Sequence, residues 1–324
     1  MNMAEALLKF DHVGKSFDGK QVIKDFNLEV HKGELLVLVG ASGSGKTTTL
    51  KMVNQLERPT DGDIYYHDKQ IKDYNVQELR WNIGYVLQQI ALFPTMTVAQ
   101  NIRVIPEMKK MRKSEIDETV TRLLQGVDLD PKKYANRFPR ELSGGEQQRV
   151  GILRALASSP DVVLMDEPFS ALDPISRTSL QNLVLRLHDE LKNTIIFVTH
   201  DMDEALKVGD RIAIMSNGNL VQVDTPEQIA QHPINDFVAS FFASARAKNI
   251  YDIYLGRVGM DGYYQDHVDT ADIVPLNGDA TIRDGLQALS AHDAIQVNDR
   301  ESGRVKGYLD RVAIIRYLSE HERA

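Results

Sequence analysis

The sequence predicts an α/β protein built on a mostly parallel sheet, and three short apolar runs support this prediction. Residues 35–39, 162–165 and 195–198 are continuously apolar, and each run is followed by turn residues and then by a helix-like segment. Continuous apolar runs are typical of strands buried on both faces, and strands that alternate with helices form parallel sheets. We therefore expect a sheet with helices on both faces.

Two helical regions are expected around this sheet. A helix should start near Ser176, because apolar residues recur along one stripe of it at helical spacing: Leu180, Leu183, Val184, Leu187 and Leu191. Residues 98–159 are expected to form a helical insertion, with a capping box at Ser114 and Asp117.

The length of 324 residues favours two domains. Near residues 242–248 the sequence becomes small and polar, which we interpret as a linker between domains at residues 4–244 and 249–324. The formal charge of −8 argues against nucleic acid as a partner. The absence of cysteine excludes disulfides and thiolate metal sites. The apolar runs are far too short to span a membrane, so any membrane span would belong to other chains.

A glycine-rich segment between the first run and the next helix predicts a phosphate site. Residues 40–47 fit the P-loop pattern, in which backbone amides and a helix N-terminus hold an anion. Lys46 would reach the β- and γ-phosphates, and the Thr47 hydroxyl would ligate Mg²⁺. The alternative is a glycine-rich turn without a ligand. The expected nucleotide-binding residues are Gly40, Ala41, Ser42, Gly43, Ser44, Gly45, Lys46, Thr47 and Thr48.

Two further strand ends carry candidate catalytic residues. Asp166 and Glu167 end the second run, and adjacent carboxylates repel each other unless they share a cation such as Mg²⁺, held by Asp166 through water. Glu167 is then placed to take a proton from an attacking water. His200 follows the third run and could contact the γ-phosphate. The alternative for all three residues is a role in capping the helices that follow.

Ser143, Gly144, Gly145 and Glu146 precede another helix and form a second candidate anion site. A single P-loop does not need a second phosphate-binding element in the same chain. The sequence therefore predicts a dimer in which this element contacts the nucleotide of a second copy.

Together these segments resemble the ABC transporter ATPase family, from Leu7 to about Phe242. The resemblance implies a P-loop ATPase core with a helical subdomain, with ATP and Mg²⁺ as cofactors. It implies that Phe17 stacks on adenine, and that Gln88 ligates Mg²⁺, senses the γ-phosphate and touches membrane subunits. The neighbouring Gln89 is the alternative, and the distance to Phe93 favours Gln88.

The same resemblance gives roles to three further elements. Ser143, Gly144, Gly145 and Glu146 match the signature sequence that closes on the partner's ATP, although the family most often has glutamine in place of Glu146. Asp173, in segment 170–173, would link the two sites across the dimer. His200 matches the family's switch histidine.

Residues 83–101 and 194–208 look most like the ATPases of quaternary-amine importers, which take up glycine betaine, carnitine or choline. This implies permease subunits and a substrate-binding protein as partners, and a place at the cytoplasmic face of the membrane. The alternative is an ABC transporter for another solute, either importer or exporter. An ABC ATPase acting on ribosomes or DNA, a P-loop kinase and a non-enzymatic nucleotide sensor fit the motifs less well.

Residues 281–318 resemble one cystathionine-β-synthase-type (CBS) motif in a small α+β domain. Residues 251–272 would be a degenerate first copy of that motif, or none. The alternative is an accessory domain that only stiffens the dimer.

Overall fold

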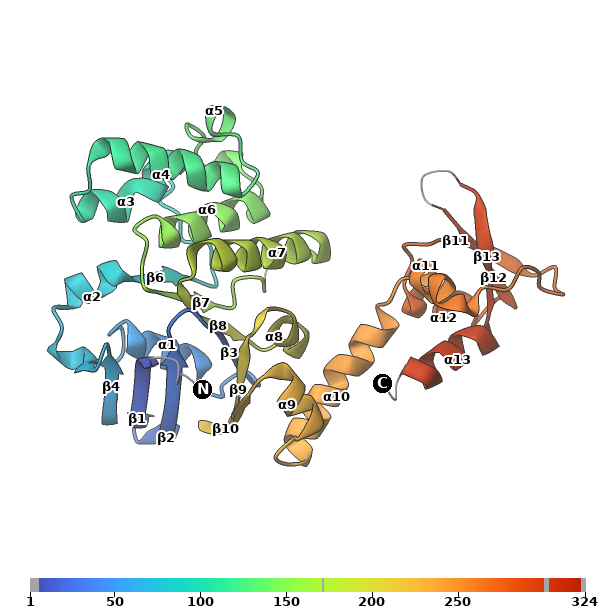
Figure 1. Ribbon diagram of the computed structural model, residues 1–324, viewed down its shortest axis with the longest axis horizontal. Helices are drawn as coiled ribbons and strands as arrows, with labels where there is room; N and C mark the ends of the chain where they lie inside the picture. The colour runs from blue at the N-terminus through green and yellow to red at the C-terminus, as the bar shows by residue number, and fades with distance from the viewer. Residues whose placement is uncertain (1–5, 171, 300–302, 322–324) are drawn as a thin grey trace. The chain divides into compact units, whose positions relative to one another are not determined.

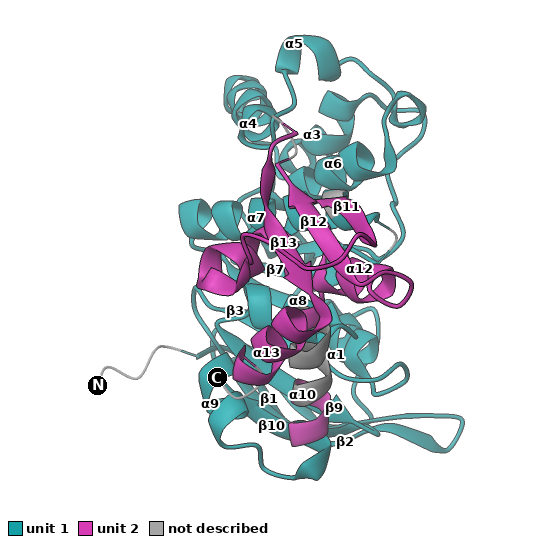
Figure 2. Cartoon of the chain, turned by 90° about the vertical axis from the view of Figure 1, so that its right-hand side faces the viewer, with its two compact units in different colours: residues 1–238 teal, residues 239–324 magenta. Residues whose placement is uncertain are grey.

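The computed structural model describes residues 6–170, 172–299 and 303–321. The chain divides into two compact units, Met1–Val238 and Ala239–Ala324 (Figure 2).

The first unit is built around a six-stranded sheet with the strand order β10-β9-β3-β8-β7-β6 (Figure 1). The five strands from β9 to β6 are parallel, and β10 pairs antiparallel with β9 at the edge. The three predicted apolar runs lie in neighbouring strands of this sheet, in which β3, β7 and β8 are fully buried. The strands are β3 (Leu35–Val39), β6 (Ile83–Val86), β7 (Val162–Asp166), β8 (Thr194–Thr199), β9 (Arg211–Ser216) and β10 (Asn219–Asp224).

A second, antiparallel sheet with the order β2-β1-β4-β5 shares a hydrophobic core with this parallel sheet. Its strands are β1 (Ala6–Phe17), β2 (Lys20–His31), β4 (Asp61–Tyr66) and β5 (Lys69–Gln70). Within the shared core, the rings of Phe10 and Phe26 pack edge to face at 5.2 Å. The sequence analysis did not predict this sheet.

The helices of the first unit include a helical group between β6 and β7, at the top of Figure 1. This group contains α3 (Val98–Met108), α4 (Lys113–Gly126), α5 (Pro131–Tyr134) and α6 (Gly144–Leu156). The remaining helices are α1 (Lys46–Val53), α2 (Val76–Asn82), α7 (Pro174–Leu191), α8 (Met202–Val208) and α9 (Pro226–Gln231), with short 3₁₀ turns at Ile71–Asp73 and Pro139–Glu141.

The predicted capping box at Ser114 and Asp117 is wrong. Helix α4 already begins at Lys113, and Glu115 accepts a hydrogen bond from the Arg112 N–H at its start. Asp117 instead pairs with Arg103 of α3, at 2.5 Å. The helix start is thus two residues earlier than the Ser-x-x-Asp pattern indicated.

The second unit holds a three-stranded sheet with the order β11-β12-β13, in which β11 and β12 are parallel and β12 and β13 antiparallel. Its core includes Leu255, Ile282, Ile295, Ile314 and Tyr317. The elements are α11 (Leu255–Val258), a π turn at Gly259–Tyr263, β11 (Ile273–Asn277), α12 (Ile282–Ala288), β12 (Ala294–Asn298), β13 (Val305–Asp310) and α13 (Arg311–His321).

The segment expected as a linker, residues 242–248, lies within one helix, α10 (Asp236–Tyr251). The small residues that suggested a break, such as Ala243, Ala245 and Ala247, have high helix propensity, and the helix continues through them.

Candidate functional site

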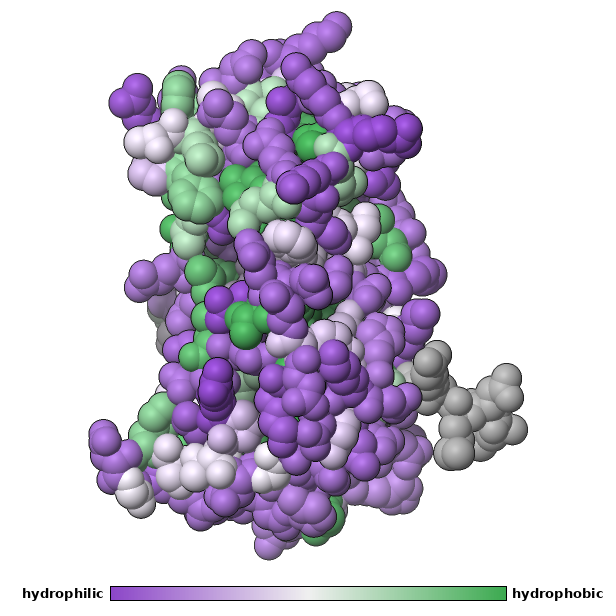
Figure 3. Space-filling model, turned by 90° about the vertical axis from the view of Figure 1, so that its left-hand side faces the viewer, coloured by the Kyte–Doolittle hydropathy of each residue, from purple (hydrophilic) through white to green (hydrophobic). Residues whose placement is uncertain are grey.

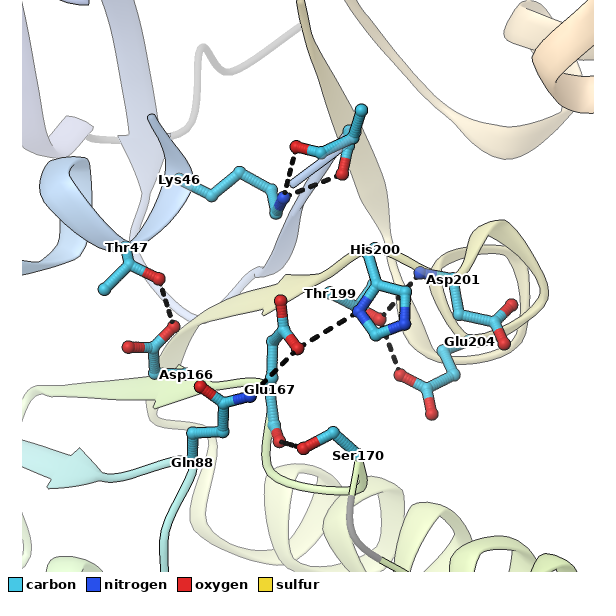
Figure 4. A network of polar contacts seen from close by, with 12 residues as sticks. Lys46, Thr47, Gln88, Asp166, Glu167, Ser170, Thr199, His200, Asp201 and Glu204 are labelled. Atoms are coloured by element: carbon cyan, nitrogen blue, oxygen red, sulfur yellow. Dashed lines mark hydrogen bonds and ion pairs between the residues drawn. The ribbon is translucent and has the colours of Figure 1, made fainter. Parts of the chain in front are cut away.

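Four adjacent strands deliver the candidate catalytic residues to one edge of the parallel sheet. The strand order β3-β8-β7-β6 places Lys46, His200, Glu167 and Gln88 just beyond neighbouring carboxyl ends (Figure 4). The carboxyl edge of a parallel α/β sheet is where such folds bind ligands. The sheet topology therefore brings together residues that lie up to 154 positions apart in the chain.

The loop after β3 needs glycine at two positions. Gly45 has a φ of 104°, and a Cβ there would lie 2.3 Å from the Ile23 Cδ1 atom. At Gly40, a Cβ would lie 2.1 Å from the carbonyl oxygen of Met215. Both contacts are too close for any side chain, so the loop reaches its tight turn only with glycine at these places. Along the loop, Ala41, Ser42 and Gly43 are exposed, Ser44 is buried, and Thr47 and Thr48 begin α1.

Lys46 is buried inside this loop, with 4% of its surface exposed. Its Nζ atom donates hydrogen bonds to the carbonyls of Gly40, at 2.7 Å, and Ala41, at 3.0 Å. Burial lowers the pKa of Lys46, whereas Glu167 and Asp166 act to raise it. Within residues 6–170, 172–299 and 303–321, no carboxylate forms an ion pair with Lys46. A buried ammonium group without an ion pair, in a glycine loop at a helix start, fits the phosphates of a nucleotide.

Thr47 and Asp166 form the part of the site that fits a magnesium ion. The Thr47 hydroxyl donates to Asp166 Oδ1 at 2.8 Å, and the Tyr85 hydroxyl lies 3.5 Å from Asp166 Oδ2. Burial raises the pKa of Asp166, and the Thr47 hydrogen bond opposes this shift. Hydroxyl and carboxylate oxygens suit Mg²⁺, which usually takes one or two protein ligands beside phosphate and water. In the described part of the chain, no group of three or more histidine or acidic side chains is placed so that it could hold a metal ion by itself.

Glu167 lies at the centre of the polar network in Figure 4. Its Oε2 atom accepts a hydrogen bond from Gln88 Nε2 at 3.3 Å and lies 3.0 Å from His200 Nδ1. The Glu167 N–H donates to the Val198 carbonyl at 3.0 Å, and its backbone has a φ of 43°. The Ser170 hydroxyl donates to the Glu167 carbonyl at 3.1 Å. Backbone and side chain are thus both held, with the carboxylate directed toward His200 and Gln88.

The sequence analysis missed one pair that fixes the strand end carrying His200. The buried Thr199 hydroxyl donates to Glu204 Oε2 at 2.7 Å and accepts from the Asp201 N–H at 3.0 Å (Figure 4). Burial raises the pKa of Glu204, and the Thr199 hydrogen bond acts against the shift. The only sequence signal for this pair is an acidic residue in the first turn of α8.

The signature residues lie apart from this network. Ser143 caps α6, with its Oγ accepting from the Glu146 N–H at 3.3 Å while the Ser143 N–H donates to Glu146 Oε2 at 2.7 Å. Ser143 and Gly144 are exposed and Gly145 is half-buried. Among the described residues, no hydrogen bond or ion pair joins these four residues to Lys46 or Glu167. One chain therefore holds two separate groups of expected phosphate-binding residues.

Phe17 and Asp173 also lie outside the Glu167 network. Phe17 ends β1 with 39% of its surface exposed, and Lys15 Nζ lies 4.5 Å from its ring centre. Asp173 Oδ1 accepts from the Ser176 N–H at 3.0 Å, at the start of α7. Ala171 of the expected 170–173 segment lies outside the described residues.

The chain belongs to the ABC transporter family. The family's sequence profile, described as "ABC transporter", matches residues 23–170. A choline transport ATP-binding protein, OpuBA of Bacillus subtilis, is 42% identical over 94% of this chain and 78% of that protein. A glycine betaine uptake system ATP-binding protein, YehX of Escherichia coli, is 40% identical over 88% of this chain and 91% of that protein. The predicted family is therefore confirmed.

Further comparisons agree on the fold of the first unit. A carnitine transport ATP-binding protein, OpuCA of Listeria monocytogenes, is 50% identical over 74% of this chain, which spans only 60% of that protein's length. The ATP-binding cassette MJ0796, solved as a dimer with ADP and Pi, has a TM-score of 0.60 and 33% identity over 68% of this chain and 98% of that one. No helix in the part of the chain that the structure describes has the length and apolar character of a membrane span.

Proposed function

We propose that this chain binds and hydrolyses ATP and powers an ABC importer for quaternary-amine osmoprotectants such as glycine betaine, carnitine or choline. The observation that supports hydrolysis is the meeting of Lys46, Glu167, His200 and Gln88 at one sheet edge. The printed functions of the OpuBA, YehX and OpuCA relatives support the cargo class.

Each residue of the network has a chemical role in this proposal. Lys46 and the loop amides would hold the β- and γ-phosphates, and Thr47 and Asp166 would hold Mg²⁺, which would neutralise phosphate charge. Glu167 would accept the proton of the attacking water, because its carboxylate lies at the same sheet edge as the P-loop lysine. His200 orients this water and contacts the γ-phosphate. Gln88, which hydrogen-bonds to Glu167, would link changes at the nucleotide to the segment that follows β6.

The exposed signature residues complete the site of a second copy. Ser143, Gly144, Gly145 and Glu146 would contact the partner's triphosphate, Asp173 would lie between the two sites, and Phe17 would stack on adenine. ATP then holds two chains closed, and product release lets them part.

The test is the Glu167→Gln variant, which keeps the shape of the side chain but cannot take the proton. With ATP and Mg²⁺ it should form a stable dimer in light scattering, with hydrolysis reduced about 100-fold or more. A chain that stays monomeric with undiminished hydrolysis would refute the proposed mechanism.

The first unit offers a surface for permease subunits. Figure 3 shows apolar side chains gathered on the upper half of the face that carries α2, α3 and α4. The exposed large apolar residues include Leu87, directly before Gln88, and Ile90 and Phe93, shortly after it. Exposed apolar groups of this kind mark interaction surfaces. We place the chain at the cytoplasmic face of the membrane, bound to permease subunits that also engage a substrate-binding protein.

The extent of the matches favours the quaternary-amine class over other solutes. A sulfate/thiosulfate import ATP-binding protein of Shewanella oneidensis is 42% identical over 73% of this chain. The choline relative is equally similar but covers 94% of the chain, so its match cannot be confined to residues 1–238. Solute-stimulated ATP hydrolysis in vesicles containing the chain and its permease tests the cargo. Stimulation by sulfate but not by any quaternary amine would refute the assignment.

For residues 249–324 we propose a CBS-like accessory domain. The order β11-α12-β12-β13-α13 supports a single motif, and residues 251–272 hold α11 and a π turn rather than a second copy. The alternative is an accessory domain that only stiffens the dimer. Measuring whether adenine nucleotides raise the melting temperature of a P-loop variant that binds no ATP separates ligand binding from a purely structural role.

A further inference from the structure

Tyr134, on the short helix α5, hydrogen-bonds to Glu146, the acidic residue of the signature segment 143–147. The Tyr134 hydroxyl donates a hydrogen bond to Glu146 Oε1 at 2.7 Å. The other carboxylate oxygen, Oε2, accepts from the Ser143 N–H at 2.7 Å. Both oxygens of Glu146 are therefore engaged within the chain.

The position of Tyr134 is itself fixed by its neighbours. The guanidinium of Arg137 lies 4.5 Å from the centre of the Tyr134 ring. The first turn of α3 is tied to this segment, because the N–H groups of Val98 and Ala99 donate to the carbonyls of Arg137 and Ala135. The segment 134–137 that carries the Tyr134 hydroxyl is therefore held in place by hydrogen bonds to α3 and by the contact between Arg137 and the Tyr134 ring.

The charge of Glu146 is unfavourable where a partner's triphosphate would bind. Helix α6 begins at Gly144, and the first N–H groups of a helix have no partner within it and attract anions. A carboxylate free to turn toward these groups would occupy them and repel phosphate. Partial burial acts to raise the pKa of Glu146, but hydrogen bonds from Ser143 and Tyr134 outweigh it and lower the pKa, so the group is ionised at neutral pH.

The surface beside the start of α6 is hollowed, which gives room for a phosphate group near Glu146. Tyr134, Ser143, Gly145, Glu146 and Arg149 all line one hollow beside the start of α6. A phosphate group in this hollow would therefore meet the Glu146 carboxylate if that side chain turned toward Gly144 and Gly145.

Resting on the proposed dimer function, we propose that Tyr134 is a positioning residue that holds the Glu146 carboxylate away from the triphosphate carried by the partner subunit. The Tyr134 hydroxyl and the Ser143 N–H together fix both carboxylate oxygens, so the carboxylate does not turn toward the N–H groups of Gly144 and Gly145 at the start of α6. Tyr134 acts through Glu146 and does not contact the nucleotide.

The test is a double-mutant cycle in the Glu167→Gln background, which accumulates the ATP-bound dimer. The measured quantity is the ATP concentration that gives half-maximal dimer. Tyr134→Phe should raise this concentration about tenfold, as expected for one lost hydrogen bond to a charged group. In the Glu146→Gln background, where the repelling charge is absent, the same change should raise it less than about twofold. Tyr254→Phe, an exposed tyrosine of the second unit, is the matched control.

Four outcomes are possible. A Tyr134→Phe effect that disappears with Glu146→Gln, and that shrinks at high salt, supports the proposal. An effect of equal size in both backgrounds shows a purely structural role for Tyr134 and overturns it, as does no effect in either. If the Glu167→Gln parent itself forms no dimer with ATP, the proposed function fails first, so the two failures are distinguishable.

Discussion

At the scale of single residues, the structure orients Glu167, the proposed catalytic base, through contacts with its neighbours. Its carboxylate contacts His200 and Gln88 from two different strand ends, while its backbone hydrogen-bonds to Val198 of β8. Such a network limits the rotamers of a side chain and pre-organises it for proton transfer.

His200→Ala should lower ATP hydrolysis about 100-fold, because loss of a group that positions the reacting water removes part of an acid–base contribution of that order. ATP affinity should change less than about threefold, since Lys46 and the loop amides carry most of the phosphate binding. Steady-state hydrolysis and equilibrium ATP binding are the two measurements. His232→Ala, at an exposed histidine, is the control. Full activity of His200→Ala would contradict the role given to this residue.

Asp210 should contribute a pH-dependent part of the stability. The His188 ring, whose Nε2 atom lies 3.6 Å from Asp210 Oδ2, and a hydrogen bond from the Leu35 N–H lower the pKa of Asp210, although burial opposes the shift. Because the folded-state pKa is below the unfolded value of about 3.9, this stabilisation is present above that pH and is lost as the pH falls through the folded pKa.

Urea unfolding of wild type and Asp210→Asn at several pH values tests this. The wild type should be more stable at pH 7, and the difference should shrink steadily below about pH 4. A difference that stays constant down to pH 3 would show that the Asp210 charge is not involved.

The candidate site could be predicted residue by residue because its members stand at fixed places after buried strands. Lys46, Asp166, Glu167 and His200 each follow a continuous apolar run, and the sheet brings such ends together. Tyr134 and the Thr199–Glu204 pair could not be predicted, because their role depends on side-chain contacts between segments that carry no motif.

At the scale of elements, the loop between β3 and α1 combines two different demands on glycine. Gly43 and Gly45 both have a positive φ, but a Cβ at Gly43 meets nothing within 4 Å, whereas at Gly45 it meets Ile23 at 2.3 Å. A side chain at Gly43 would therefore meet backbone strain alone, whereas one at Gly45 would meet both strain and steric overlap.

Gly45→Ala should destabilise the nucleotide-free chain more than Gly43→Ala. Gly43→Ala should lower the free energy of unfolding by about 1 kcal/mol, because it introduces only the strain of a left-handed backbone. Gly45→Ala adds steric overlap with Ile23 of β2, and its total cost should be about 2–4 kcal/mol. Denaturant unfolding of both variants without nucleotide measures the difference. Equal destabilisation of the two would show that Ile23 moves aside freely.

The β3, β7 and β8 strands were predictable because burial on both faces makes them uniformly apolar. The antiparallel sheet was not, because irregular backbone interrupts its alternation: His12 and Asp25 have positive φ values, and the β1–β2 pairing shifts register repeatedly. A shift in register moves residues to the other face, so the period of two is lost.

At the scale of the whole molecule, each of the two compact units has a hydrophobic core of its own among the residues that the structure describes. One is formed by residues of β1 to β9 and the other by residues from Leu255 to Tyr317. Each unit can therefore unfold as its own cooperative transition.

Ile314→Ala should lower the melting temperature of one transition only. Ile314 is fully buried in the second core, and its truncation should cost that unit about 2–5 kcal/mol. ATP should raise the other transition, because ligand binding stabilises only the unit that binds it. Calorimetry with and without ATP measures both. A single transition that both changes shift together would show that the two units unfold as one.

The resting contacts of Lys46 have a consequence for ligand selection. Its ammonium group already has two carbonyl acceptors, so an incoming anion gains only the difference between the old and new hydrogen bonds. A lone orthophosphate gains little from this exchange, whereas a polyphosphate chain also engages the loop amides and the helix start. In the proposed function, Lys46 would therefore favour a polyphosphate over a single phosphate, and the phosphate released by hydrolysis would not block the loop.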